Sequence, residues 1–502
     1  MLNIGWSKRD VSTLDPVLIT GQFHARVSKG ILDPILIHAL VLEDGNDVAI
    51  FLCGDFVSGR GTLPAIREKV AQRNPEIPTQ KILFNITHTH CGPSLSAVNQ
   101  WKDVPHEGLD VTEPAGYVDF FTTQAADAIV EAYENRKPGA MTYGYSYAVV
   151  AHSRRVTYYD DVSKRSNAEA PKLKSLSING HAVMYGKTND DQFAGYENGA
   201  DHFVNLMYTF DMDGNLTGAI INVPCPSQNS EQEHWLTADY WHDVRTLLKE
   251  KYGDIYVMSQ CAAAGDLSPR ILHYKNAQAR RYALKYAEKP LSDKAANQLE
   301  LYNRADIAER ICTAFDEALA WAKKDLRYEA PIRHTVRDIE VERWLISDED
   351  YAFACSELEK LQDFTFQDTG DPRADYHANT RYITAMQRFK NIINRYEIQK
   401  EFPMGKVELH AIQVGDIAFV TNPFELYMDY QHQIQARSPY MQTFVIQLCD
   451  VPGKEYPTGY LATDRGEANV GYSANIYSNQ VSYKGGQSLV RETLKALNEM
   501  AE

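Results

Sequence analysis

The most informative stretch of the chain is residues 81–93, which read KILFNITHTHCGP. Its apolar beginning, residues 81–86, predicts a β-strand, and the chain passes from this strand directly to His88 and His90. Residues two apart in an extended chain point to the same side, and the Gly-Pro pair that follows predicts a turn. Strand ends that open into loops are where α/β folds place their sites.

His88 and His90 are therefore candidates for an active site at this strand end. A neutral imidazole is a common zinc ligand, so either side chain is suited to bind a divalent metal. The alternative is a pair of ordinary surface histidines, and the motif alone does not decide between the two.

The flanking sequence alternates strand-like and helix-like segments. Residues 34–43 and 47–53 predict two strands joined by an Asp-Gly turn. Further elements are expected as helices over 63–72 and 117–136 and as hairpins over 206–223 and 407–420. This order predicts an α/β fold, a mixed-sheet α/β sandwich. We expect one domain over residues 1–502, with a helical insert over about 276–400.

The net charge of the chain limits the classes of partner that it can bind. The 502 residues include 51 Lys and Arg against 67 Asp and Glu, which gives a formal net charge of −16. A field of this sign repels phosphate backbones and anionic bilayers. We therefore expect neither nucleic acid nor a membrane surface as a partner, and instead a small soluble substrate.

The amino terminus and the cysteines indicate the compartment. Residues 1–10 lack the apolar stretch and small-residue cleavage site of a secretory signal. No apolar run approaches the roughly twenty residues needed to cross a bilayer. The seven cysteines form no CxxC pair, so neither a disulfide framework nor a structural zinc site is indicated. A cytoplasmic location is the expectation.

Three further segments carry side chains suited to chemistry. Ser268 follows a predicted strand and a run of small residues, and it is a candidate nucleophile or hydrogen-bond donor. Glu425 stands between a predicted strand and a helix, where it would either bind a metal or favour the helix dipole. Arg154 ends a strand-like run and is suited to hold an anionic or carbonyl group. Each of them alone has an ordinary structural explanation.

Taken together, these motifs resemble the neutral (alkaline, non-lysosomal) ceramidase family. The matching segments are DPILIHALVL at 33–42, THTHCGP at 87–93, AGDLSP at 264–269, PFE at 423–425, the pair Gly459-Tyr460, and Tyr472. They occur in the family's order and cover most of residues 1–480. The resemblance implies the catalytic domain of that family, in which a zinc-bound water attacks an amide carbonyl.

Carried over position by position, the resemblance implies a role for each residue. The expected zinc ligands are His88, Glu425 and Tyr460. The expected catalytic residues are His90, which steadies the reacting carbonyl, Ser268 near the metal, and the substrate-contacting Tyr472, while Arg154 is expected to bind substrate.

The chain departs from the family pattern at one metal ligand. The family's second zinc-binding histidine lies in a segment that corresponds to residues 222–227, where this chain has Pro226, which has no ligand atom. Four nearby side chains are chemically suited to take its place. The sequence does not choose among Cys225, His234, Asp239 and His242.

A second departure concerns the carboxyl end and the substrate. The family carries a C-terminal β-sandwich domain, and this chain ends soon after Tyr472, so we expect that domain to be absent. With the acidic surface and the missing leader, this argues against ceramide, a membrane lipid that must be extracted at an interface.

Three hypotheses for the function follow. The first is a metal-dependent hydrolase, with zinc as the expected ion, that attacks a soluble amide, ester or glycoconjugate through a metal-activated water. The second is a carbohydrate-active hydrolase or lyase on the same scaffold, in which His90, Ser268 and Tyr472 handle protons. The third is a non-catalytic binding protein that has lost zinc, which Pro226 favours and the retained polar residues disfavour. The oligomeric state stays open, a homo-oligomer included.

Overall fold

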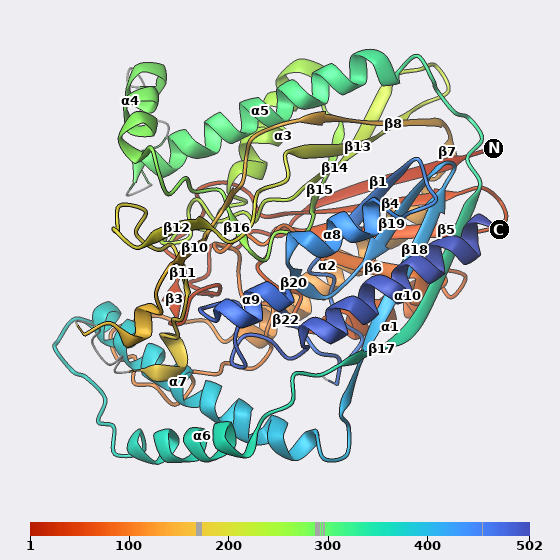
Figure 1. The fold of residues 1–502 in the computed structure, drawn as a ribbon. Coiled ribbons are helices and arrows are strands. Elements are labelled where there is room, and N and C mark those ends of the chain that lie inside the picture. Colours follow the sequence, from red (N-terminus) through yellow and green to blue (C-terminus); the bar gives the residue numbers. More distant parts are fainter. Residues whose placement is uncertain (167–172, 287–291, 293, 295–296, 454) are drawn as a thin grey trace.

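Three mixed β-sheets form the centre of the molecule (Figure 1). The computed structural model describes residues 1–502 except 167–172, 287–291, 293, 295–296 and 454. Each of the three sheets combines antiparallel pairs with one parallel pair at an edge. The predicted α/β fold with mixed sheets is confirmed.

The three sheets are built from segments in sequence order. The first has the order β6 (Ile82–Ile86), β5 (Val48–Gly54), β4 (Leu36–Glu43), β1 (Asn3–Asp10) and β7 (Lys137–Pro138). The second has the order β15 (Tyr256–Cys261), β14 (Leu216–Val223), β13 (Phe203–Phe210) and β8 (Ala140–Tyr147). The third has the order β17 (Ile332–Glu342), β18 (Met404–Val414), β19 (Ile417–Thr421) and β21 (Gln442–Ile446).

One apolar core joins the inner faces of the three sheets. It contains Phe51 of β5, Met207 of β13, Met258 of β15, and Phe419 and Phe444 of the third sheet, each fully buried. The rings of Phe419 and Phe444 stack with centroids 4.5 Å apart. Each sheet packs side chains of one face into this shared core, and the packing fixes the positions of the three sheets relative to one another.

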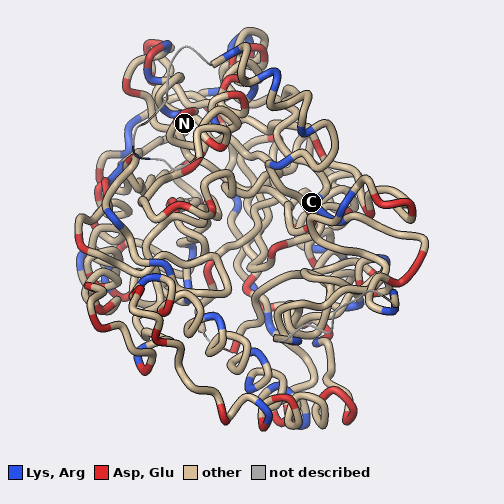
Figure 2. Tube along the Cα trace, turned by 90° about the vertical axis from the view of Figure 1, so that its left-hand side faces the viewer, with Lys and Arg blue, Asp and Glu red and all other residues tan. Residues whose placement is uncertain are grey.

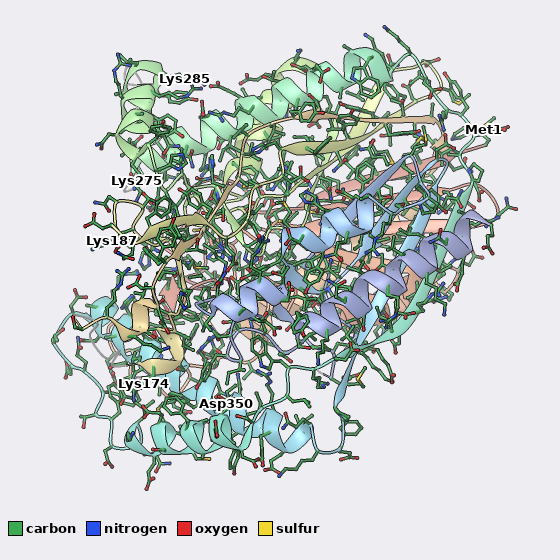
Figure 3. The ribbon with its side chains drawn as sticks, viewed as in Figure 1. Met1, Lys174, Lys187, Lys275, Lys285 and Asp350 are labelled. Carbon is green, nitrogen blue, oxygen red and sulfur yellow. The ribbon has the colours of Figure 1, made fainter. Side chains whose placement is uncertain are left out.

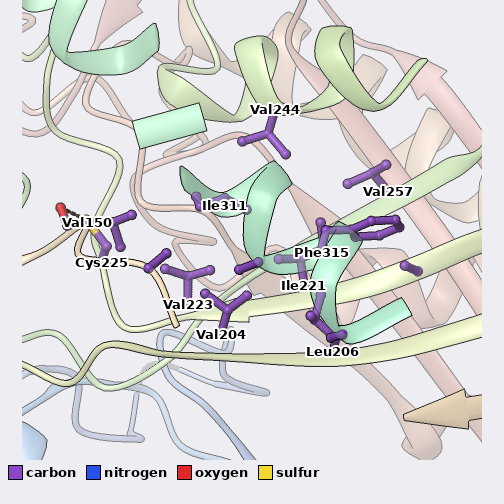
Figure 4. Packing of buried hydrophobic residues seen from close by; sticks show 14 of the residues in the cluster. Val150, Val204, Leu206, Ile221, Val223, Cys225, Val244, Val257, Ile311 and Phe315 are labelled. Atoms are coloured by element: carbon purple, nitrogen blue, oxygen red, sulfur yellow. Dashed lines mark hydrogen bonds between the residues drawn. The ribbon is translucent and has the colours of Figure 1, made fainter. Parts of the chain in front are cut away.

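Helices cover the outer face of each sheet. The first sheet carries α1 (Leu63–Arg73) and α2 (Pro114–Glu134), the second carries α3 (Tyr240–Tyr252) and α5 (Gln298–Ala322), and the third carries α8 (Met428–Gln435) and α10 (Tyr483–Ala501). Figure 4 shows this packing on the second sheet, where Ile311 and Phe315 of α5 lie against Ile221 of β14. Alternating apolar positions on strands and an apolar stripe on each helix account for these layers.

Shorter elements complete the fold. They are β2 (Leu18–Ile19) with β3 (Arg26–Val27), β16 (Leu267–Ser268) with β9 (His152–Ser153), β20 (Phe424–Leu426) with β22 (Gly459–Leu461), and β10 (Arg155–Tyr158) between β11 (Ala182–Met184) and β12 (Phe193–Tyr196). The remaining α-helices are α4 (Lys275–Tyr286), α6 (Asp348–Lys360), α7 (Pro372–Ile398) and α9 (Asp464–Asn469).

The stretch 276–400, where a helical insert was expected, divides into two parts. Helices α4 and α5 precede β17, a long strand of the third sheet, and α6 and α7 follow it as a helical pair. Figure 1 shows α6 and α7 together at the lower edge of the molecule, away from the three sheets. No helix among the described residues is both long and apolar enough to cross a lipid bilayer.

The buried side chain of Arg155 connects β10 with Glu197 and with the segment that carries Tyr472. Arg155 lies 2.5 Å from Glu197, and both side chains are fully buried. Arg155 also donates hydrogen bonds to the backbone carbonyls of Val470 and Tyr472, at 2.7 Å and 2.6 Å. A buried guanidinium with all these partners fixes the chain around residues 470–472.

We predict that Arg155→Met lowers the free energy of unfolding by about 3–5 kcal/mol, because it leaves the Glu197 carboxylate buried and unpaired. Urea denaturation measures the loss. Arg337→Met is the matched control, since Arg337 pairs with Glu499 at the exposed surface and its loss is expected to cost less than about 1 kcal/mol. Equal losses in both variants would contradict this account of Arg155.

Candidate active site

A cavity of about 1310 Å³ opens beside the end of β6. Its wall combines the chain after β6 with β20, β22, α7 and the loop that precedes Tyr185. Six of the seven residues expected at the site line it, namely His88, His90, Arg154, Glu425, Tyr460 and Tyr472. Segments more than 300 residues apart in sequence therefore meet at one cavity.

His88 is held in one orientation by its backbone and by one hydrogen bond. The strand β6 ends at Ile86, and His88 has a φ of 63°, so the two histidines meet through a turn and not along a continued strand. The imidazole Nδ1 of His88 lies 2.8 Å from the carbonyl oxygen of Val57. Because a carbonyl only accepts, Nδ1 carries the proton, and Nε2 of a neutral His88 keeps its lone pair.

Glu425 faces this lone pair. Its Oε2 lies 3.4 Å from Nε2 of His88. Strand β20 pairs in parallel with β22, and the register places Glu425 opposite Tyr460. Burial on its own would raise the pKa of Glu425, but its contacts with His88, Arg154 and Tyr460 outweigh burial, so the pKa is lowered and the carboxylate is ionised.

Arg154 connects Glu425 with Tyr460. Its Nη2 donates hydrogen bonds to the Tyr460 hydroxyl at 3.1 Å and to the Gly265 carbonyl at 2.7 Å, and it lies 3.8 Å from Oε2 of Glu425. The guanidinium is almost fully buried. Burial raises the pKa of Tyr460 well above its ordinary value, so its phenol is protonated in the free protein.

His90 lies next to His88, with the two Nε2 atoms 3.3 Å apart. Its Nε2 is also 2.7 Å from the side-chain amide of Gln228, and its Nδ1 is 3.5 Å from Oε2 of Glu231. Burial, followed by His88 and Arg26, holds the pKa of His90 well below its ordinary value. Because the amide nitrogen of Gln228 only donates, Nε2 of a neutral His90 accepts this hydrogen bond, and Nδ1 carries the proton on the side of Glu231.

None of the four side chains considered as a substitute for the missing histidine lines the cavity. Cys225 is buried in the core of the second sheet, His234 bonds the Val27 carbonyl at 3.2 Å, and the Asp239 carboxylate caps α3. His242 follows on the first turn of that helix.

Gln228, two residues after Pro226, lies at the cavity wall instead. Sequence reasoning missed this amide because glutamine carries no recognisable metal or catalytic spacing. In the sequence, only the departure from the family pattern at Pro226 pointed to the segment that contains Gln228.

Ser268 does not line the cavity. Its side chain is fully buried, and its hydroxyl oxygen accepts hydrogen bonds from the Tyr185 hydroxyl at 3.3 Å and from the backbone N–H of Arg270 at 3.2 Å. Tyr185 and Arg270 do line the cavity. In this conformation Ser268 therefore reaches the site through Tyr185.

Tyr472 forms an aromatic wall with two neighbours. Its ring meets the Tyr460 ring edge-on at a centroid distance of 5.6 Å, and the Phe23 ring at 5.4 Å. Burial raises the pKa of Tyr472, so its hydroxyl is a neutral donor at ordinary pH. Such a donor is suited to bind a carbonyl or hydroxyl oxygen of a substrate.

The donor set for a metal is small. Within the part of the chain that the structure describes, no group of three or more His, Cys, Asp or Glu side chains is arranged to hold a metal ion. The expected set contains only two such residues, His88 and Glu425, together with the phenol of Tyr460.

Solved structures match this fold over nearly its whole length. A neutral ceramidase from Pseudomonas aeruginosa and a ceramidase complexed with C2 each superpose with a TM-score of 0.64, covering 99% of this chain and 75% of the other at 15% sequence identity. The chain has a ceramidase-like fold. No family model matches the sequence, and no curated protein does. At this identity the likeness to ceramidase establishes the fold and not the activity.

The candidate site depends on a close approach of two backbones at Gly265. A Cβ at this position would lie 2.2 Å from the Glu425 carbonyl oxygen. We predict that Gly265→Ala lowers the free energy of unfolding by about 1–3 kcal/mol, because β20 must shift to make room. Differential scanning calorimetry measures the effect. Gly199→Ala is the control, because a Cβ there meets nothing within 4 Å, and equal effects of the two substitutions would refute the close approach.

Proposed function

We propose that this protein is a metal-dependent hydrolase that cleaves a soluble amide, ester or glycoconjugate by means of a metal-activated water. The observation that carries the proposal is the meeting of two acceptors, Nε2 of His88 and Oε2 of Glu425, 3.4 Å apart. The ceramidase-like fold supports a hydrolytic reaction, and the residues of this chain supply the argument for a cation.

The position of the proton on His88 favours a cation at this site. Because Nδ1 is bonded to the Val57 carbonyl, a neutral His88 presents only a lone pair to the Glu425 carboxylate. Two such acceptors repel unless a proton or a metal ion lies between them. Two ligands of a tetrahedral zinc ion with bonds of about 2.0–2.2 Å lie about 3.3–3.5 Å apart, which agrees with the observed separation.

The residues present therefore fit a divalent ion held by His88, Glu425 and Tyr460. None of Cys225, His234, Asp239 and His242 lines the cavity to replace the histidine lost at Pro226, so the protein would contribute fewer ligands than the family pattern implies. When bound, such an ion would supply an acidified water as the nucleophile.

The protein's own side chains have separate tasks in the proposed reaction. Arg154 holds Tyr460 and balances the charge of Glu425. We assign to Tyr472, a neutral hydrogen-bond donor, the binding of the oxygen on which negative charge develops, and His90 lines the same cavity beside His88. A donor of this kind typically contributes about 3 kcal/mol to the transition state.

A carbohydrate-active enzyme on the same scaffold is the second candidate. The cavity wall favours it through side-chain amides that suit sugar hydroxyls, namely Gln22, Gln100, Asn179, Gln228, Gln232 and Gln480. The aromatic rings of Phe23 and Tyr472 offer stacking surfaces. Release of an unsaturated sugar product, against release of an acid and an amine or alcohol, separates the two candidates.

We predict that the purified protein binds about one zinc ion per chain and that His88→Ala weakens this binding by about a hundredfold or more. Glu425→Gln is expected to act in the same direction. Metal content by mass spectrometry after dialysis, and zinc affinity by competition with a chelating dye, measure the effect. Activity on a panel of acylated amines, esters and glycosides is followed with and without chelator.

His242→Ala and Ser268→Ala are the controls for metal binding. His242 lies on α3 outside the cavity wall, and Ser268 contacts the cavity lining through Tyr185 and Arg270 and not through an expected metal ligand, so both variants should keep the zinc. Equal zinc affinity in wild type and His88→Ala, or full activity after complete removal of metal, would refute the proposal.

A further inference from the structure

The cavity is rich in arginine, although the protein as a whole is acidic. Its wall contains five arginines, Arg60, Arg154, Arg270, Arg381 and Arg388, against the three carboxylates Glu231, Glu425 and Asp450. The whole chain has a net charge of −16, with both signs interspersed along the trace in Figure 2. The described lining contains no lysine, and Lys187 and Lys275 lie at the edge of the molecule in Figure 3.

Two of the five arginines have carboxylate partners. Arg154 lies 3.8 Å from Glu425, and Arg270 forms an ion pair with Glu231. The Asp450 carboxylate accepts hydrogen bonds from backbone N–H groups at the start of α1, at 2.8 Å and 2.9 Å. The cavity's carboxylates are therefore already engaged.

The other three arginines have no such partner. Within the described residues, no ion pair at 4.0 Å or less joins the guanidinium of Arg60, Arg381 or Arg388 to a carboxylate. Arg60 is exposed, whereas Arg381 and Arg388 are half-buried, and a partly desolvated positive charge without a counter-ion favours the binding of an anion. The lowered pKa of the Arg388 guanidinium, which burial causes, is consistent with this.

Helix α7 presents two of these arginines on one face. Arg381, Thr384 and Arg388 are spaced by three and four residues, which places them above one another on a helix, and all three line the cavity. Arg388 is held by hydrogen bonds from Nε to the Ser175 carbonyl, at 2.9 Å, and from Nη2 to the Ser478 hydroxyl, at 3.2 Å. The guanidinium is thus positioned before any ligand arrives.

Aromatic contacts connect this face with the candidate active site. The guanidinium of Arg388 lies 5.0 Å from the centre of the Phe23 ring, which in turn contacts Tyr472. Tyr472 meets Tyr460, one of the expected metal ligands. One substrate molecule in a cavity of about 1310 Å³ can therefore reach both the arginines and the site of reaction.

We propose that the substrate is a soluble molecule with a carboxylate or sulfate group, and that this group binds to the arginines on the cavity face of α7. Guanidinium groups bind such anions with paired, charge-assisted hydrogen bonds, which lysine does not provide in the same geometry. The inference rests on the proposed function for the claim that the bound anion is a substrate. Anion binding itself is measured without turnover, so each claim can fail separately.

The test measures binding of sodium sulfate, D-glucuronate and D-glucose to the full-length protein by isothermal titration calorimetry at constant ionic strength. We expect wild type to bind at least one of the two anions with a dissociation constant below about 50 mM and to bind glucose more weakly. Arg381→Gln and Arg388→Gln are each expected to weaken anion binding by about fivefold or more. Preference for sulfate or for glucuronate tells which of the two anionic groups the site accepts.

Lys390→Gln is the matched control, because Lys390 is an exposed cation on the same helix that does not line the cavity. It should leave anion binding unchanged. Circular dichroism and thermal unfolding confirm that each variant is folded, and the double substitution Arg381→Lys with Arg388→Lys, which keeps the charge, serves as a second test if a glutamine variant is unstable. Equal anion binding by wild type and by the folded variants, or no binding of either anion by wild type, would overturn the proposal.

Discussion

The candidate site depends on the parallel pairing of two very short strands, β20 and β22. This pairing puts Glu425 beside Tyr460, and the absence of a side chain at Gly265 lets the neighbouring backbone approach closely enough to support it. The guanidinium of Arg154 then bonds both the Gly265 carbonyl and the Tyr460 hydroxyl. Without this arrangement Glu425 and Tyr460 would not meet beside His88.

Much of the fold follows from local patterns, whereas the site does so only through the resemblance. The hairpin of β4 and β5 and the strand before His88 appear where alternating apolar residues and an Asp-Gly turn predict them. Nothing local predicts that Glu425 meets His88, because that contact depends on how whole sheets pack. The positive φ of His88 and the position of Ser268 behind Tyr185 likewise depend on tertiary contacts.

The residues that sequence reasoning missed share one property: they are common types in ordinary settings. Gln228 has no motif of its own, and Arg381 and Arg388 lie on a charged helix whose exposed and cavity faces look alike in sequence. Only the structure shows that these side chains line one cavity. An acidic molecule that gathers guanidinium groups in one cavity would select its ligand by charge, which is the basis of the proposal of a water-soluble anionic substrate.

The most direct test of the account is the identity of the atoms around a bound metal. X-ray absorption spectroscopy of the zinc-loaded protein reports the first coordination shell without any assumption about the substrate. The account predicts only nitrogen and oxygen neighbours at about 2.0–2.2 Å, with imidazole scattering that disappears in His88→Ala. A sulfur neighbour at about 2.3 Å, which would require a cysteine such as Cys225, or a first shell of water alone, would contradict it.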